Sequence, residues 1–193
     1  MRLFSYIVAN DRGFAPNPFW GYCTLATCKP KIRNAAQKGD WIVGLSPKAL
    51  ENKLVYAMKV EEKLTHDQYF NDPRFAAKKP EPESPVSKRK CGDNMYYRAK
   101  CNGLYEQRKS AIHGAEDFKR DTSSEYVLIS AKDGFYYFGK DAKELPSGIL
   151  QKIVVGRGHR SNFEPSTIKG VIEFISRLPK GINGEPRDIT TLQ

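Results

Sequence analysis

The sequence predicts an α+β protein in which a curved, mostly antiparallel sheet or small β-barrel carries helices packed on its outside. Three observations favour this fold class: strand-like segments outnumber long helical patterns, tight turns and irregular loops join them, and one clear amphipathic helix lies late in the chain. With 193 residues, of which 39% are hydrophobic, the chain can bury a sizeable core. We therefore expect a single domain over residues 1–193.

The first half of the chain contains three strand candidates. Leu3–Ala9 and Lys53–Val60 are rich in β-branched and aromatic side chains, and Trp41–Leu45 is a short apolar run typical of a buried strand. A short helix is predicted over Lys31–Gln37, and another begins near His66.

A segment rich in proline and charge interrupts this pattern. Residues 78–90 contain three prolines, many charged residues and no aromatic side chain. Such a composition cannot bury enough apolar surface to form a packed core. We predict a mobile insert at about residues 78–90 that does not separate two domains.

The second half supplies a strand pair and the clearest helix. Ser124–Ser130 reads as a strand, Asp133-Gly134 is a strong hairpin signal, and Phe135–Gly139 is the expected return strand. Ile149–Val155 is either a helix end or a strand. Pro165–Leu178 has apolar residues at helical spacing and is predicted to be a helix.

Charge gives the first indication of function. Thirty-two Lys and Arg residues against 22 Asp and Glu residues give a net charge of +10. This excess favours polyanionic partners, above all nucleic acid or nucleotides, although a basic solvated surface would give the same count. No apolar run approaches the roughly 20 residues that span a bilayer, and the first residues do not resemble a signal peptide. We therefore expect a cytoplasmic protein with no membrane partner.

The four cysteines do not predict a metal site. Their spacings differ from the paired C-x2-C pattern of zinc ribbons, and a cytosolic chain keeps its thiols reduced. Free thiols are favoured over zinc ligands or disulfides, and neither a metal nor a cofactor is predicted. The four residues are Cys23, Cys28, Cys91 and Cys101.

An aromatic loop over Phe14–Tyr22 is the first candidate binding segment. Bases stack on aromatic rings, and Lys29 and Arg33, which follow the loop, could hold phosphates. Trp20 and Tyr22 are the expected stacking residues. The alternative is that the loop forms a hydrophobic plug against the sheet.

A glycine-containing basic loop is the second candidate. In Gly156–Asn162, backbone N–H groups could approach an anion, and Arg157 and Arg160 could bind phosphate or a base edge. His159 in the same loop could act as an acid or base. The alternative is a solvated basic turn.

Two further groups are weaker candidates. Asp93 and Asn94 could read a base edge beside Tyr96, or they could simply form an Asx-turn. His113 and Asp117 would share one face of a helix, but they make a poor metal site without a second His or a Cys nearby. Standard catalytic motifs such as a Walker A loop or G-x-S-x-G are absent from the sequence.

The order of these motifs resembles a known family. The run Phe14–Arg33, followed by Gly39–Gly44 and Gly156–Arg160, is similar to the second of the nucleotide modification associated domain families. That family is bacterial and viral and is associated with enzymes that modify bases in DNA. The resemblance therefore implies a base-modification context, with modification enzymes as possible partners.

A more distant resemblance is to PUA-like modules, including the EVE and ASCH types. It rests on Gly39–Val43 and on the turn Tyr69–Phe75. Such modules resemble pockets that hold a modified or flipped base in an aromatic cleft. This resemblance implies a PUA-like curved antiparallel β-barrel, and the insert at residues 78–90 departs from its compact form.

Two hypotheses follow. The leading one is a module that binds DNA or RNA, possibly modified, or a nucleotide; its candidate contact residues are Trp20, Tyr22, Lys29, Arg33, Asp93, Asn94, Tyr96, Arg157, His159 and Arg160. The competing one is a transferase or hydrolase acting on nucleotides or bases, with an acid–base group among His159, His113 and Asp93. A third possibility is that the aromatic loop is a protein interface.

Overall fold

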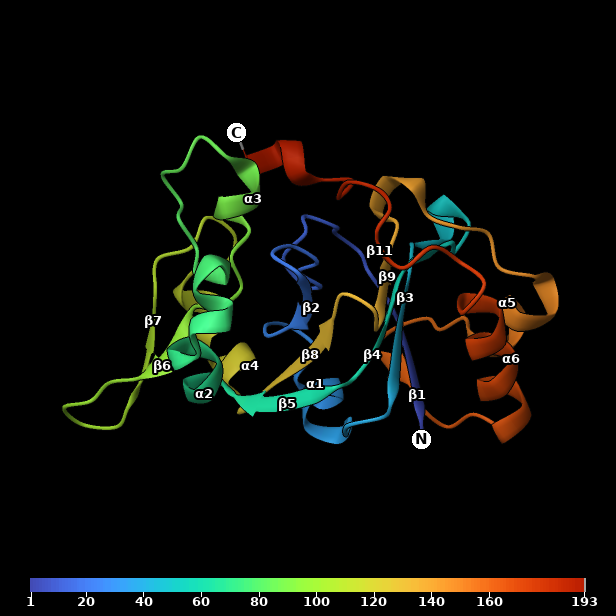
Figure 1. The fold of residues 1–193 in the computed structure, drawn as a ribbon, viewed down its shortest axis with the longest axis horizontal. Coiled ribbons are helices and arrows are strands. Elements are labelled where there is room, and N and C mark those ends of the chain that lie inside the picture. Colours follow the sequence, from blue (N-terminus) through green and yellow to red (C-terminus); the bar gives the residue numbers. More distant parts are fainter. Residues whose placement is uncertain (193) are drawn as a thin grey trace.

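The computed structural model describes residues 1–192 and has the predicted α+β architecture (Figure 1). The strands are β1 (Leu3–Ile7), β2 (Tyr22–Leu25), β3 (Trp41–Leu45), β4 (Leu54–Lys59), β5 (Glu62–Thr65), β6 (Tyr96–Arg98), β7 (Tyr105–Gln107), β8 (Tyr126–Ala131), β9 (Phe135–Tyr137), β10 (His159–Arg160) and β11 (Gly181–Ile182). The α-helices are α1 (Pro30–Ala35), α2 (His66–Asn71), α3 (Ser87–Lys90), α4 (Ala115–Thr122), α5 (Ser147–Ile153) and α6 (Pro165–Ile175). Short 3-10 helices cover Lys48–Leu50, Pro73–Lys78, Gly139–Asp141 and Ile189–Leu192.

The largest sheet has the strand order β10-β1-β3-β4-β9-β11. Most of its pairs are antiparallel, but β1 pairs with β3, and β9 with β11, in parallel. A smaller sheet has the order β2-β8-β5, and β6 and β7 form a hairpin. Within residues 1–192 none of these sheets closes into a barrel, so the PUA-like barrel stays a prediction.

Helices α5 and α6 cover one face of the largest sheet, at the right of Figure 1. Successive side chains of a strand point to opposite faces, so alternate residues of β1 and β3 face these helices. Burying such side chains is the main stabilising contribution to the fold. The core on this side includes Leu3, Trp41, Val43, Ala57, Ile153, Ile168, Val171 and Ile175.

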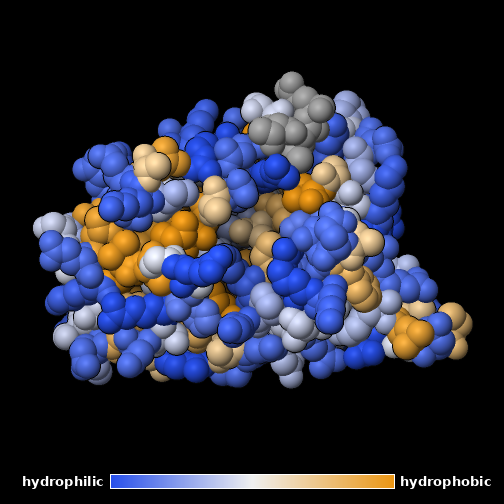
Figure 2. All heavy atoms as spheres, turned by 180° about the vertical axis from the view of Figure 1, so that it is seen from behind, coloured by the Kyte–Doolittle hydropathy of each residue, from blue (hydrophilic) through white to orange (hydrophobic). Residues whose placement is uncertain are grey.

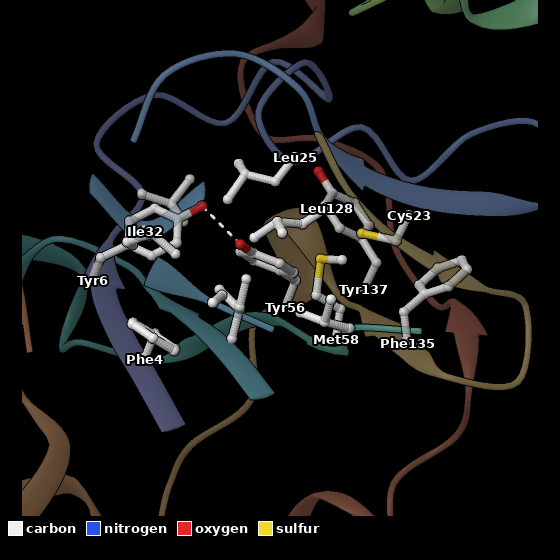
Figure 3. Close-up of a cluster of buried hydrophobic side chains, with 14 of the residues drawn as sticks. Phe4, Tyr6, Cys23, Leu25, Ile32, Tyr56, Met58, Leu128, Phe135 and Tyr137 are labelled. Carbon is white, nitrogen blue, oxygen red and sulfur yellow. Dashed lines mark hydrogen bonds between the residues drawn. The ribbon is translucent and has the colours of Figure 1, made fainter. Parts of the chain in front are cut away.

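The opposite face of the same sheet packs against β2, β8 and α1 (Figure 3). Two buried tyrosines lie at its centre, and the hydroxyl groups of Tyr6 and Tyr56 are 2.8 Å apart. This hydrogen bond satisfies both polar ends inside an apolar cluster. The surrounding core includes Phe4, Cys23, Leu25, Ile32, Met58, Leu128, Phe135 and Tyr137.

Most predicted strands and helices of the main core are confirmed with shifts of one to three residues at their ends. The Asp133-Gly134 turn exists, but the predicted hairpin is wrong. Strand β8 pairs with β2 and β5, whereas β9 pairs with β4 and β11. The turn therefore connects the small sheet to the large one. Strand β9 does not pair with β8, because β2 and β5 already lie on the two sides of β8.

The charged segment at residues 78–90 is anchored at its start. The ammonium group of Lys78 is fully buried and donates to Asn17 Oδ1 (2.8 Å), Asn17 O (3.1 Å) and Tyr22 O (3.0 Å). Burial lowers the pKa of Lys78 to about 8, against the opposing effect of the nearby Asp93. The segment ends in α3 beside the buried Cys91. Mobility between these two ends stays a prediction.

All four cysteines are free thiols. Cys23 and Cys91 are buried, Cys28 is half-buried and Cys101 is exposed. Along residues 1–192, helices with both the length and the apolar character required to cross a membrane are absent.

Candidate active site

A cavity of about 690 Å³ opens beside the end of β1 and the start of α1. Figure 2, which views the molecule from behind, shows a hollow near the centre of this face, with apolar side chains lying deep between hydrophilic ones. The volume is in the range of about 300–1,000 Å³ that is usual for small-molecule sites. Five separate segments line the cavity, namely 7–10, 12–15, 28–32, 112–120 and 158–159, and not every residue of each contributes.

Cys28 lies at this cavity in an unusual backbone conformation. Both Cys28 and Lys29 have positive φ angles, of 52° and 40°, immediately before α1 begins at Pro30. Residues other than glycine rarely adopt this left-handed region, and such strain concentrates at functional sites. Two contacts hold the turn: Cys28 N donates to Asp121 Oδ1 (2.9 Å), and Cys28 O accepts from Arg33 Nε (2.8 Å).

The thiol of Cys28 is the first member of a Cys–His–Asp arrangement. Its Sγ lies 3.6 Å from Nε2 of His113, and Nδ1 of the same ring donates to Asp121 Oδ2 at 2.7 Å. The His113 side chain is 11% exposed and that of Asp121 is fully buried. A nucleophile beside a base that a third group orients is the geometry of covalent catalysis.

The protonation states fit this arrangement. Burial opposes a charge on His113, but hydrogen bonds to Asp121 and Cys28 outweigh it and raise the pKa of His113 to about 9. Burial would raise the pKa of Asp121, yet the hydrogen bond and charge of His113 dominate and lower it to about 2. At neutral pH a protonated imidazole therefore faces the sulfur, which is the setting that makes cysteines reactive.

The same three residues are the group within residues 1–192 whose ligand atoms could approach a metal ion together. The hydrogen bonds of this group also give it a second possible use. His113 directs Nδ1 to Asp121 and Nε2 to Cys28, so one imidazole bridges the thiol and the carboxylate. This bridging is the geometry of a catalytic triad.

Arg33 stabilises the backbone around this site. Its guanidinium is fully buried and donates to the carbonyl oxygens of Asp121 (2.5 Å), Tyr126 (2.6 Å) and Ser124 (3.2 Å), in addition to that of Cys28. Arg33 thus connects the backbone of Cys28 to the backbone of Asp121. Tyr96 adds a hydrogen bond from its hydroxyl to Asp121 Oδ2 at 3.0 Å.

Arg120 brings a second positive charge to the sulfur. Its Nη2 lies 3.9 Å from Cys28 Sγ and 3.3 Å from His113 Nε2. Ion pairs with Asp117 (2.9 Å) and Asp121 (3.1 Å) fix its position. A guanidinium held here can stabilise negative charge that develops near the nucleophile.

The structure brings four sequence candidates to this cavity: Lys29, His113, Asp117 and His159. The predicted helical face shared by His113 and Asp117 is wrong, because α4 begins only at Ala115, and the imidazole binds Asp121. His159 lies on the edge strand β10, and Lys29 places its ammonium 4.6 Å from the centre of the Tyr6 ring.

Four other candidates are fully buried, namely Arg33, Asp93, Asn94 and Tyr96. Asp93 accepts hydrogen bonds from Thr24 (2.6 Å) and Tyr69 (2.9 Å) in the core. The amide of Asn94 donates to backbone carbonyl groups. These side chains serve internal hydrogen bonds and do not line the cavity.

The remaining candidates lie outside the cavity. Trp20 is partly exposed and has Arg89 over its ring, with the guanidinium carbon 5.9 Å from the ring centre. Tyr22 packs against a phenylalanine of the core. Arg157 is exposed, and Arg160 donates to Lys152 O at 3.0 Å.

Cys28 and Asp121 were not among the site residues that the sequence predicted. They lie 93 positions apart, and His113 lies 85 positions from Cys28, so no local motif connects them. One sequence signal was available, namely a cysteine two residues before the proline that starts a short helix. That signal alone does not identify a nucleophile.

The histidine titrations provide a direct test of the triad. We expect the imidazole of His113 to titrate at about 9 and that of His66 at about 3, because burial and the charge of Arg33 keep His66 neutral. Proton and nitrogen NMR of the three histidines measures both values. In Asp121→Asn the pKa of His113 should fall, since it loses a charged acceptor, while His66 serves as the internal reference.

These two pKa shifts make the stability of the protein depend on pH. His113 contributes stability that is complete below its ordinary pKa and is lost as pH rises through about 9. Asp121 contributes stability that is lost as pH falls through about 2. A His113 titration near the ordinary value of about 6.5 would contradict the ion pair.

Comparison with known proteins gives one positive finding. The family model for nucleotide modification associated domain 2 matches residues 1–193, which include all five segments that line the cavity. Neither the curated proteins nor the solved structures gave a match to the chain.

Proposed function

Because the chain belongs to the nucleotide modification associated domain 2 family, we propose that it is an enzyme of nucleotide or DNA base modification that uses Cys28 as its nucleophile. The observation that carries this proposal is the hydrogen-bonded series from Cys28 through His113 to Asp121. Family membership supplies the context of base modification, and the triad supplies the reaction class. Recognition of a modified or flipped base would then be the binding step of the same cavity.

The chemistry available to this site is group transfer through a covalent intermediate. The thiolate of Cys28 attacks an electrophilic carbon of the substrate and forms a carbon–sulfur bond. The bond to the leaving group breaks, and protonated His113 gives its proton to that group. Water or an acceptor nucleophile then attacks the same carbon and gives a proton to His113, and the carbon–sulfur bond breaks.

The positions of the supporting groups suit these steps. Asp121 holds the ring of His113 in one orientation and stabilises its charged form. Arg120 can stabilise negative charge on the substrate near the sulfur. Phe14 contacts the His113 ring edge-on, with ring centres 4.5 Å apart, and provides an apolar wall beside the reacting atoms.

The test is a search for turnover and for the intermediate. The protein is incubated with modified and unmodified nucleotides and oligonucleotides, and products and intact protein are weighed by mass spectrometry. We expect a product together with a substrate-derived mass on the peptide that contains Cys28. Binding without any product or adduct across this panel would instead favour a binding module.

A further inference from the structure

We propose that Lys29, Lys31 and His159 form a phosphate subsite of the Cys28 cavity, so that the substrate is a phosphorylated nucleotide rather than a free base or nucleoside. This inference rests on the proposed function. It adds that the substrate molecule that contains the reacting carbon also carries an anionic group, and that the protein binds this group at a separate place in the cavity.

The cavity wall is mainly basic. The lining contains four Lys or Arg side chains, Arg12, Lys29, Lys31 and Arg120, and among the residues that the structure describes Asp117 is its only acidic residue. That carboxylate already pairs with Arg120 at 2.9 Å, and the charge of Arg12 acts on Asp188 outside the lining. The positive charge left for a ligand is therefore mainly that of Lys29 and Lys31.

Lys29, Lys31 and His159 lie near one another in the lining. Strand β10 pairs His159 with Tyr6, and the ammonium of Lys29 lies 4.6 Å from the centre of the Tyr6 ring. Lys29, Lys31 and His159 form no ion pair with a carboxylate in the part of the chain that the structure describes. Burial, followed by the charges of Lys31 and Lys29, lowers the pKa of His159. The positive charges of Lys29 and Lys31 therefore act on the same imidazole, and an anion bound there would offset them.

The lining also contains apolar side chains. Phe14 and Ile112 belong to it, and Phe14 contacts the ring of His113 with the ring centres 4.5 Å apart. Lys29, Lys31 and His159 contribute charged and polar groups to the same lining. A nucleotide combines the same two features, a flat base and a phosphate.

The subsite differs from the phosphate contacts that the sequence favoured. Arg157 is exposed and does not line the cavity, and Arg160 lies over the ring of Phe163 and binds a backbone carbonyl group. Lys31, which is exposed at the start of α1, takes their place. Arg157→Ala is therefore a matched control for Lys31→Ala.

The experiment uses the full chain with Cys28→Ser, which prevents turnover, and measures binding by calorimetry. The probes are the deoxynucleoside monophosphates, the matching nucleosides and short oligonucleotides. We expect a monophosphate to bind at least about tenfold more tightly than its nucleoside, and Lys31→Ala or Lys29→Ala to weaken it about 10- to 100-fold. Arg157→Ala should leave the affinity unchanged.

A spectroscopic readout accompanies the affinities. A bound phosphate places negative charge beside His159, so the pKa of His159 should rise on adding the monophosphate and stay unchanged on adding the nucleoside. Tighter binding of an oligonucleotide than of every monophosphate, still dependent on Lys31, would assign the phosphate to a nucleic-acid backbone. The reverse order would assign it to a free nucleotide.

Two outcomes would overturn the subsite. Equal affinity for nucleoside and monophosphate would exclude a phosphate contact, and equal losses in Lys31→Ala and Arg157→Ala would indicate general surface charge. Neither outcome affects the covalent mass on Cys28. Conversely, lysine-dependent binding with an inert Cys28 would retain the subsite and remove the proposed function.

Discussion

Alanine at Cys28 is expected to lower turnover by a factor on the order of 10⁴ to 10⁶, with the fold and the nucleotide affinity retained. The size of the loss follows from the role of the sulfur, because without it no carbon–sulfur bond can form. The side chain is half-buried and makes no packing contribution comparable to the core cysteines. Turnover by mass spectrometry and a thermal unfolding curve check both parts of the expectation.

Members of a triad act as one unit, and this gives a sharper form of the test. His113→Ala alone and Cys28→Ala alone should cost similar factors, and the double variant should be no slower than either. Cys101→Ser is the control, because Cys101 is an exposed thiol that does not line the cavity. Independent, multiplying losses in the double variant would show that the two residues do not act together.

A methionine at Arg33 is expected to reduce the free energy of unfolding by about 3–5 kcal/mol. The substitution roughly keeps the volume but removes a donor that four backbone carbonyl oxygens share. Burial lowers the pKa of Arg33 to about 10, against the opposing charge of Asp121, so the side chain is cationic at neutral pH. Urea denaturation measures the change.

Two further variants test whether the loss of stability comes from the hydrogen bonds of the Arg33 guanidinium. Arg33→Lys should recover only part of the stability, because an ammonium group cannot reproduce the fork of the guanidinium. Arg157→Ala, at an exposed position, should change stability by no more than about 0.5 kcal/mol. If Arg33→Met kept its stability and lost nucleotide binding instead, Arg33 would be a ligand contact, as its position in the sequence suggested.

The sequence predicted the elements better than their partners. The apolar patterns of β1, β3 and α6 report burial directly, and the structure confirms these three elements. The strand order could not be predicted in this way, because it depends on which sheet edge is available to each strand. The Asp133-Gly134 turn illustrates this: its local conformation was readable, whereas its connection between two sheets was not.

The site was less predictable for a related reason. An arginine held among carbonyl groups and an arginine on the surface look the same in sequence, so Arg33 was grouped with Lys29 as a nucleic-acid contact. Aspartates are ambiguous in the same way. Asp117 has the helical spacing to His113, but the aspartate that binds the ring lies eight positions away at Asp121.

The distances along the chain between the triad residues also govern when their side chains can meet. Cys28 meets His113 and Asp121 only after 85 and 93 further residues have been placed. In an unfolded or partly synthesised chain the contacts of Cys28 with His113 and Asp121 are therefore absent, and they form only with completion of the native structure. We expect the rate at which iodoacetamide alkylates Cys28 to differ between the native and the unfolded chain, and this rate can be measured without any substrate.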